Sequence, residues 1–246
     1  MKADPTVQQR LLALQAHDAA LARLEHRRRT LPELTVIAEA DTRLTALRGD
    51  VVRAETEVGD LDRELRRLED DVDQVRRRSE RDQQRMQAGS VPAKELESLQ
   101  HEVESLARRQ SDLEDTELEV MERREDAETR AAGVRAEVAT VTESKAAAEK
   151  ARDAAYEQID ADAAADTRAR AAIAAEMPAD LLALYEKVRA VSGGVGAAEL
   201  RARRCEGCRL ELAGGELRAA RAAAPDEVLR CENCRRILVR TAESGL

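Results

Sequence analysis

Apolar residues recur at heptad spacing over two long stretches of the chain. Between residues 44 and 75 the gap between apolar positions alternates between three and four, and charged or polar side chains fill the positions between. Such a pattern places the apolar side chains on one narrow stripe of a helix, which is typical of a coiled coil. The stripe consists of Leu44, Leu47, Val51, Ala54, Val58, Leu61, Leu65, Leu68, Val72 and Val75.

A second heptad run follows Ala88–Pro92, the internal site where Gly and Pro both interrupt the helical pattern. Some companion positions of this run are polar, and in the first run the pattern weakens at Ser79 and Asp82. The members of the second run fall every seven residues, and they are Leu99, Leu106, Leu113, Val120, Ala127, Val134, Val141, Ala148 and Ala155.

Prolines limit both arms. Pro32 interrupts the first arm, because a proline in a helix interior removes a hydrogen bond and kinks or ends the helix. A short opening helix, residues 6–29, therefore precedes it, and Met177-Pro178 ends the second arm. The arms are nearly equal in length, which favours an antiparallel, monomeric hairpin with its turn at Gly89–Pro92 over a parallel dimer. They span residues 6–87 and 94–177.

The register of this hairpin follows from the two apolar stripes. Antiparallel pairing around the turn brings apolar residues of the two arms together in five successive layers. Because the stripes come from separate stretches of sequence, their agreement supports a hairpin. The expected pairs are Leu47 with Val134, Ala54 with Ala127, Leu61 with Val120, Leu68 with Leu113, and Val75 with Leu106.

Two short segments lie between the hairpin and the C-terminal domain, within residues 178–196. A short apolar helix is expected over residues 180–188, and Ser192–Gly196 is expected to be a flexible linker at a domain boundary. The predicted domains are a coiled-coil hairpin, a segment with the short helix and Gly-rich linker, and a small C-terminal domain. They span residues 1–177, 178–196 and 197–246.

All four cysteines lie in this C-terminal domain, in two C-x-x-C pairs separated by 22 residues. Two residues between thiolates let one tight turn present both sulfurs to one ion, and two such turns complete the four-thiolate shell of a structural zinc. The spacing predicts one structural Zn²⁺ on Cys205, Cys208, Cys231 and Cys234. Two disulfides or an iron–sulfur cluster are the alternatives.

Short strands are expected around the two cysteine pairs, at residues 209–212, 227–230 and 236–240, which makes this domain a β zinc ribbon. Apolar side chains are few here, so the metal should supply much of the folding free energy.

The composition agrees with long helices and excludes a large globular core. The chain has no Phe, no Trp and two Tyr, while charged residues make up 37% of its 246 residues. Its formal charge of −9 disfavours binding of the helical part to nucleic acid or to an anionic membrane. The sequence shows no signal peptide or membrane-spanning stretch, and paired thiols suit a reducing compartment, so we expect a cytoplasmic protein.

Several arginines surround the cysteines. A cationic face formed by Arg204, Arg235, Arg236 and Arg240 could dock an acidic protein partner or nucleic acid, or could be solvated surface. Four thiolates and Zn²⁺ carry −2 together, and no aromatic side chain is available there for base stacking. A protein partner, not identified by the sequence, is therefore the leading hypothesis, and nucleic acid is the alternative.

No constellation of residues predicts catalysis. The three histidines, His17, His26 and His101, lie on predicted helices and are interpreted as solvated, and a four-thiolate zinc has no open coordination position for a water molecule. We expect a non-enzymatic zinc-binding adaptor or chaperone-like protein that binds its partner through the ribbon and the coiled coil.

Four segments carry a family resemblance: KELESLQHEVESL, LEDTELEVMERRE, DLLALYEKVR and CEGC…CENCRRILVR. With these, the chain resembles the bacterial four-cysteine zinc-ribbon family with an N-terminal coiled-coil hairpin, in particular its actinobacterial members. The resemblance implies a mainly α fold, zinc on the four cysteines, and an adaptor or chaperone-like role. Some members are linked to a sigma factor or to RNA, but no residue here carries those links over. Arg235 departs from the pattern, because many relatives have Gly after the last cysteine.

Overall fold

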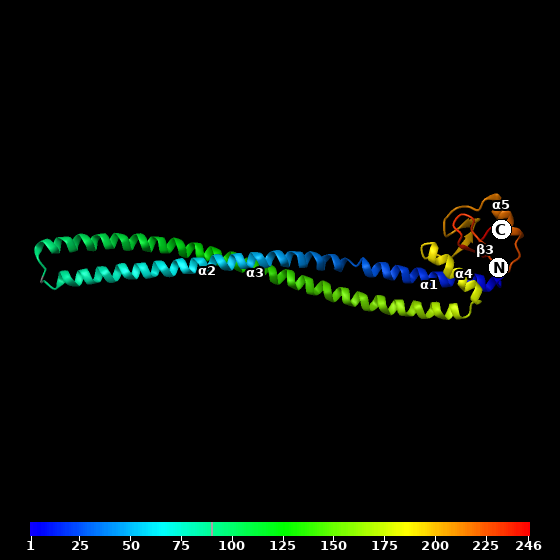
Figure 1. The fold of residues 1–246 in the computed structure, drawn as a ribbon, viewed down its shortest axis with the longest axis horizontal. Coiled ribbons are helices and arrows are strands. Elements are labelled where there is room, and N and C mark those ends of the chain that lie inside the picture. Colours follow the sequence, from blue (N-terminus) through cyan, green and yellow to red (C-terminus); the bar gives the residue numbers. More distant parts are fainter. Residues whose placement is uncertain (90) are drawn as a thin grey trace. The chain divides into compact units, whose positions relative to one another are not determined.

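The computed structural model describes residues 1–89 and 91–246 and is mainly helical (Figure 1). The chain forms two compact units, one of Met1–Leu34 with Glu149–Leu246, and one of Thr35–Ala148. The helices are α1 (Pro5–Arg29), α2 (Pro32–Gln87), α3 (Ala93–Ala175), α4 (Ala179–Val191) and α5 (Gly214–Ala222). The strands are β1 (Ala197–Arg201), β2 (Arg204–Cys205), β3 (Leu229–Arg230) and β4 (Ile237–Arg240).

The unit of Thr35–Ala148 is the predicted antiparallel hairpin, with α2 and α3 side by side (Figure 1). All ten positions of the first apolar stripe and all nine of the second are buried or half-buried. Of the predicted turn at Gly89–Pro92, Ser90 lies outside the described residues. On either side of it α2 ends at Gln87 and α3 begins at Ala93, as the Gly-Pro signal predicted.

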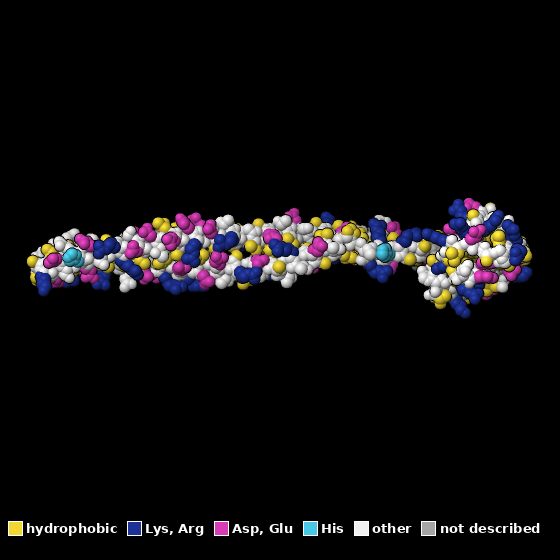
Figure 2. Space-filling model, turned by 90° about the horizontal axis from the view of Figure 1, so that it is seen from above, with side chains coloured by type: hydrophobic (Ala, Val, Ile, Leu, Met, Phe, Trp, Pro, Cys, Tyr) yellow, Lys and Arg dark blue, Asp and Glu magenta, His cyan; other side chains and the backbone are white. Residues whose placement is uncertain are grey.

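Leu61 lies in one cluster with its predicted partner Val120 and also with Ala127, for which Ala54 was the predicted partner. Val120 and Ala127 lie two turns apart on α3, so Leu61 packs between them. Ion pairs also join the arms, as in Arg85 with Glu95 at 2.8 Å, and Figure 2 shows the two charge signs interspersed along the hairpin. Most such pairs are exposed and contribute little, so the apolar seam sets the register.

Near the turn the seam contains a polar layer. Ser79 and Asp82, where the heptad pattern weakens, are both buried, and the Ser79 hydroxyl accepts a hydrogen bond from Gln83 at 3.3 Å. The Oδ2 atom of Asp82 is buried without a hydrogen-bond partner within the described part of the chain. An unsatisfied buried oxygen costs free energy, so the seam is weaker near the turn than at its middle.

A cross-link tests the hairpin and its register. In a variant with Leu61→Cys and Val120→Cys, we expect a short bis-maleimide to join the two new thiols within one chain, because these side chains share one cluster. Denaturing electrophoresis and peptide mapping would identify the link, with the unsubstituted protein as control. Links between chains at equal yield would show a dimeric coiled coil instead.

The predicted interruption at Pro32 is confirmed, because α1 ends at Arg29 and α2 begins at Pro32. A proline is tolerated in the first turn of a helix, where its missing N–H has no intrahelical acceptor. At the other end of α1, the Asp4 carboxylate accepts the Thr6 N–H at 2.8 Å, and Pro5 occupies the first turn. Both ends of this short opening helix are therefore fixed by local sequence.

The ribbon is a four-stranded sheet of order β2-β1-β4-β3 in which β1 and β4 are parallel and the other pairs are antiparallel. Ile237 and Val239 of β4 pack on one face in a core shared with α1 and α4, while Leu238 packs on the other face beside the cysteines. The N-terminus lies beside the segment before β3, where Lys2 and Glu227 form an isolated antiparallel bridge and the Ala3 N–H donates to the Asp226 carbonyl at 2.7 Å. The sheet is therefore covered on both faces.

Three local expectations for this region were wrong or incomplete. Residues 209–212 do not form a strand and contain a single bridge from Glu211 to Arg204. Two elements were not predicted: β1, whose Ala-Ala start has low strand propensity, and α5, which lies between the cysteine pairs. The segment Ser192–Gly196 is not a free linker throughout, since Gly196 is buried against the ring of Tyr185.

Packing also groups the segments differently from the predicted domains, because α1 and the end of α3 belong to the same unit as α4 and the ribbon. Within the described ranges 1–89 and 91–246, no helix is long and apolar enough to cross a membrane.

Candidate metal centre

The two cysteine pairs form two turns with the same hydrogen bonds, which we call the first knuckle (Cys205–Cys208) and the second knuckle (Cys231–Cys234). In the first, the Arg209 N–H donates to the Cys205 carbonyl at 2.6 Å. In the second, the Arg235 N–H donates to the Cys231 carbonyl at 2.9 Å. The first knuckle begins at the last residue of β2 and the second follows β3, and these two strands are the edges of the sheet.

The four sulfur atoms are placed for one metal ion. They all lie within 4.8 Å of one another, with Cys205 Sγ 3.8 Å from Cys234 Sγ and Cys208 Sγ 3.9 Å from Cys231 Sγ. A tetrahedral site with Zn–S bonds of about 2.3 Å requires sulfurs about 3.8 Å apart. All four thiols are free of disulfides. The donor set and its spacing therefore fit one structural Zn²⁺, as the sequence predicted.

The electrostatics of the thiols show why a cation is needed. Burial raises the pKa of the Cys205 and Cys231 thiols. Burial also acts to raise the pKa of Cys234, but hydrogen bonds from the backbone and side chain of Arg236 and from neighbouring thiols lower it to about 7. Because zinc binds thiolates, it must displace protons from buried sulfurs, and its positive charge then compensates the thiolates.

A buried glutamate from α5 supports the second knuckle. Glu216 lies in the first turn of α5, and its Oε1 atom accepts the Glu232 N–H at 3.0 Å. Leu212 and Ala220, which flank it, share a buried cluster with Cys205 and Cys231. Glu216 could not be identified from the sequence, because an isolated glutamate in an Ala- and Arg-rich segment gives no sign of burial.

Each knuckle is followed by an arginine in the left-handed backbone region. The φ angle is 60° at Arg209 and 63° at Arg235, and both residues are exposed. For a residue with a Cβ atom this conformation costs about 1–2 kcal/mol, which glycine would avoid. Two side chains are therefore kept at positions where glycine would be less strained. From the sequence, the absence of glycine was noticed at Arg235 but not at Arg209.

The four arginines of the predicted cationic face do not all lie free on the surface. Arg204 and Arg235 are exposed, as expected. Arg236 instead donates to the carbonyl oxygens of Ser192, Val195 and Gly207, at 2.7–3.2 Å. Arg240 donates to four carbonyl oxygens of residues 223–227. Both guanidinium groups donate their hydrogen bonds to backbone carbonyl oxygens of nearby segments. These two side chains therefore stabilise the fold and are not free cations.

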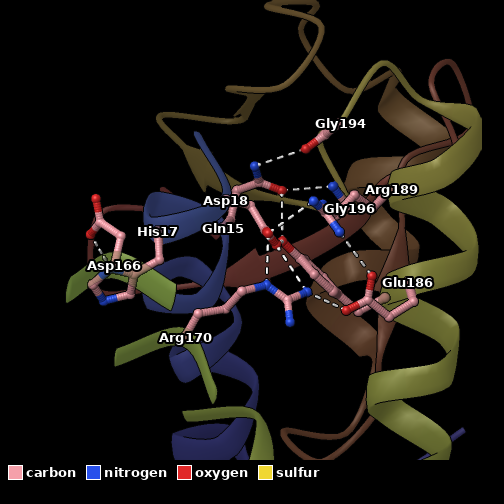
Figure 3. Close-up of polar contacts among 10 residues, drawn as sticks. Gln15, His17, Asp18, Asp166, Arg170, Glu186, Arg189, Gly194 and Gly196 are labelled. Atoms are coloured by element: carbon pink, nitrogen blue, oxygen red, sulfur yellow. Dashed lines mark hydrogen bonds and ion pairs between the residues drawn. The ribbon is translucent and has the colours of Figure 1, made fainter. Parts of the chain in front are cut away.

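A buried carboxylate joins three helices in what we call the α4 seat, which consists of Gln15, Asp18, Arg170, Tyr185 and Arg189 (Figure 3). The Asp18 side chain is 0% exposed and pairs with Arg170 at 2.8 Å and with Arg189 at 3.1 Å. The Tyr185 hydroxyl donates to it at 2.6 Å. Burial, and then this bond, raise the pKa of Tyr185. The seat therefore fixes α1, α3 and α4 to one another.

One histidine also differs from its expected role. His26 and His101 are exposed, as expected. His17 is half-buried instead, and its Nδ1 atom lies 2.8 Å from Asp166 Oδ1 across α1 and α3 (Figure 3). It contributes to helix packing beside the α4 seat.

Comparisons with known proteins agree with this architecture. Residues 14–193 match the CT398-like coiled coil hairpin domain, and residues 204–238 match the C4-type zinc ribbon domain. An uncharacterized protein of Mycobacterium tuberculosis is 38% identical over 240 residues, which are 98% of either chain. A second one, from Mycobacterium leprae, is 29% identical over 213 residues, 87% of this chain and 91% of the relative.

Solved structures show the same fold. A Mycobacterium smegmatis protein with 37% identity superposes with a TM-score of 0.83 over 98% of this chain and 100% of that one. CT398 from Chlamydia trachomatis, with 19% identity, gives a TM-score of 0.65 over 96% of this chain and 98% of its own. The chain thus belongs to the family of CT398-like coiled-coil hairpin proteins and carries a C-terminal C4-type zinc ribbon.

Proposed function

We propose that this protein is a non-enzymatic, zinc-dependent adaptor whose ribbon docks an acidic protein partner through the exposed arginines of the two knuckles. The observation that carries the proposal is the pair Arg209 and Arg235, both exposed and both in the left-handed region. Strain that persists where glycine would relieve it points to a use for the side chain. Arg204, also exposed, adds a third cation to this knuckle surface.

A binding role also agrees with the metal geometry. Four thiolates fill a tetrahedral shell and leave no position for a reactive water molecule, so the zinc would stabilise the fold and would not catalyse a reaction. The hairpin adds a second contact surface, where the large apolar side chains of Leu118 and Met121 lie exposed one helical turn apart. Free thiols in the metal site suit a reducing compartment, and we place the adaptor in the cytoplasm.

Glycine substitutions separate partner binding from folding. The double change Arg209→Gly and Arg235→Gly removes both cations and relieves backbone strain. We therefore expect the ribbon to gain about 0.5–1 kcal/mol of stability per site, measured as the denaturant midpoint of zinc release. Proteins that the wild type recovers from its cell of origin should be lost by this variant, as quantified by affinity purification and mass spectrometry.

The matched control is Arg218→Ala with Arg221→Ala, which removes two exposed arginines of α5. This control has the same net charge as the glycine variant but keeps the knuckle surface, so we expect it to recover the wild-type partners. If the glycine variant recovers every partner at wild-type yield, the knuckle arginines are solvated surface and the proposal fails.

Nucleic acid, bound through the ribbon, is the alternative ligand. The ribbon of residues 197–246 contains no aromatic residue for base stacking, and Arg236 and Arg240 already donate to carbonyl oxygens. Binding of labelled RNA and DNA oligonucleotides, titrated against salt, distinguishes the two ligands. Tight binding at physiological salt, lost in the glycine variant, would favour nucleic acid over a protein partner.

A further inference from the structure

Arg236 contacts both the metal centre and the segment that leaves α4. It lies two residues after Cys234, and its backbone carbonyl accepts the Cys231 N–H at 3.0 Å. Its Nη1 atom donates to the Gly207 carbonyl of the first knuckle at 3.2 Å, and its Nη2 atom donates to the Ser192 carbonyl at the end of α4 at 2.7 Å. One residue thus contacts both knuckles and the end of α4, the second knuckle through its backbone and the other two through its side chain.

The close packing of this side chain depends on glycine at position 207. A Cβ atom there would lie 2.7 Å from the Cδ atom of Arg236 and 3.0 Å from the Cβ atom of Ala198. These distances are too short for carbon atoms, so any larger residue would displace the arginine. The first knuckle is therefore shaped to accept Arg236.

Residues 192–196, whose carbonyl oxygens accept hydrogen bonds from Arg236, also contact the α4 seat. The Gly196 N–H donates to Gln15 Oε1 at 2.7 Å, and Gln15 Nε2 donates to the Gly194 carbonyl at 3.2 Å (Figure 3). The Tyr185 hydroxyl oxygen lies 3.1 Å from Gln15 Oε1, and a Cβ atom on Gly196 would lie 2.7 Å from the Tyr185 ring. The backbone of 192–196 is thereby fixed from both sides, by Arg236 and by the seat.

We propose that Arg236 is a positioning residue of the metal centre, which joins the two knuckles to the α4 seat and couples zinc binding with the packing of that seat. Metal binding orders the knuckles, the ordered knuckles hold Arg236, and Arg236 holds residues 192–196 against Gln15 and Tyr185. Coupling between two sites is reciprocal. If zinc binding favours the packed seat by a given factor, the packed seat raises zinc affinity by that same factor, so a change that disrupts the seat must weaken zinc binding.

Zinc affinity tests the positioning role. We expect Arg236→Gln to weaken zinc binding about 10- to 100-fold in competition with a chromogenic chelator, as is usual when a residue that orients metal ligands is replaced. Arg236→Lys should restore little, because one ammonium group cannot reach three separated carbonyls. The control is Arg235→Gln, which changes the neighbouring exposed arginine and should leave the affinity within about threefold of the wild type.

Tyrosine fluorescence tests the coupling. The chain has no Trp and two Tyr, so Tyr156→Phe leaves Tyr185 as the single emitter. In this background, removal of zinc by a chelator should increase acrylamide quenching of Tyr185, and Arg236→Gln should abolish that dependence on metal. An unchanged affinity in Arg236→Gln, or metal-dependent quenching that persists in that variant, would overturn the proposal.

The reciprocal variant guards against simple unfolding of the ribbon. Gln15→Ala lies on α1, leaves every knuckle contact in place, and should lower zinc affinity severalfold. Gln9→Ala, at an exposed position of the same helix, is its control and should have no effect. If Gln15→Ala binds zinc as tightly as the wild type, the seat and the metal centre are independent and the coupling does not exist.

Discussion

Replacing Cys234 by Ser is expected to abolish stable zinc binding and unfold the ribbon, while most of the helix content remains. The four-thiolate shell fits one ion, and a structural zinc contributes about 10–16 kcal/mol of apparent binding free energy, more than so small a sheet could supply by itself. Helix content should change little, because α2 and α3 hold 56 and 83 residues and the hairpin core contains no metal ligand. Far-UV circular dichroism and amide hydrogen exchange measure the two effects separately.

The control for this variant is Asn233→Ser, which alters an exposed residue of the same knuckle and keeps all four thiols. It should retain zinc and the protection of amides in β1 and β4. The account would be wrong if Cys234→Ser kept one tightly bound zinc, or if loss of metal melted the hairpin of residues 35–148 together with the ribbon.

Asp18→Ala should destabilise the unit that contains the ribbon by about 3 kcal/mol. Removing one partner of a buried ion pair leaves the other charge without compensation, which commonly costs ~3–5 kcal/mol. The lower end applies here because Arg170 and Arg189 remain partly in solvent and keep Glu186 as a second acceptor. Both tyrosines lie in this unit, so tyrosine fluorescence during denaturant unfolding reports on it alone.

Asp160→Ala is the matched control, because that carboxylate pairs with Arg28 but its side chain is 61% exposed. An exposed pair is worth less than about 1 kcal/mol, so this change should scarcely move the unfolding midpoint. Equal effects of the two substitutions would mean that Asp18 is not a buried anchor.

The features that sequence predicted well are those encoded locally. The heptad stripes placed Leu61 and Val120 in the seam because side-chain period alone decides which face of a helix is buried. Pro32 and the turn before Ala93 set the helix ends for reasons of backbone geometry. The cysteine spacing identified the metal ligands because two residues between thiolates suffice for a knuckle.

The features that it missed depend on contacts between distant segments. Asp18 reads as one more polar residue of a helix, and only the approach of Arg170 and Arg189 makes it an anchor. Arg236 and Arg240 read as free cations, because no pattern shows that carbonyl oxygens will surround them. The strand β1 forms because β4 lies beside it, since its own sequence has little strand propensity.

Metal stoichiometry is the most direct test of the central claim, that four cysteines hold one structural zinc. Native mass spectrometry combined with elemental analysis of the purified protein should give one zinc per chain and no iron. A denatured mass with all four thiols reduced should accompany it. A chain without zinc, a mass reduced by two disulfides, or iron with labile sulfide in place of zinc would contradict the account.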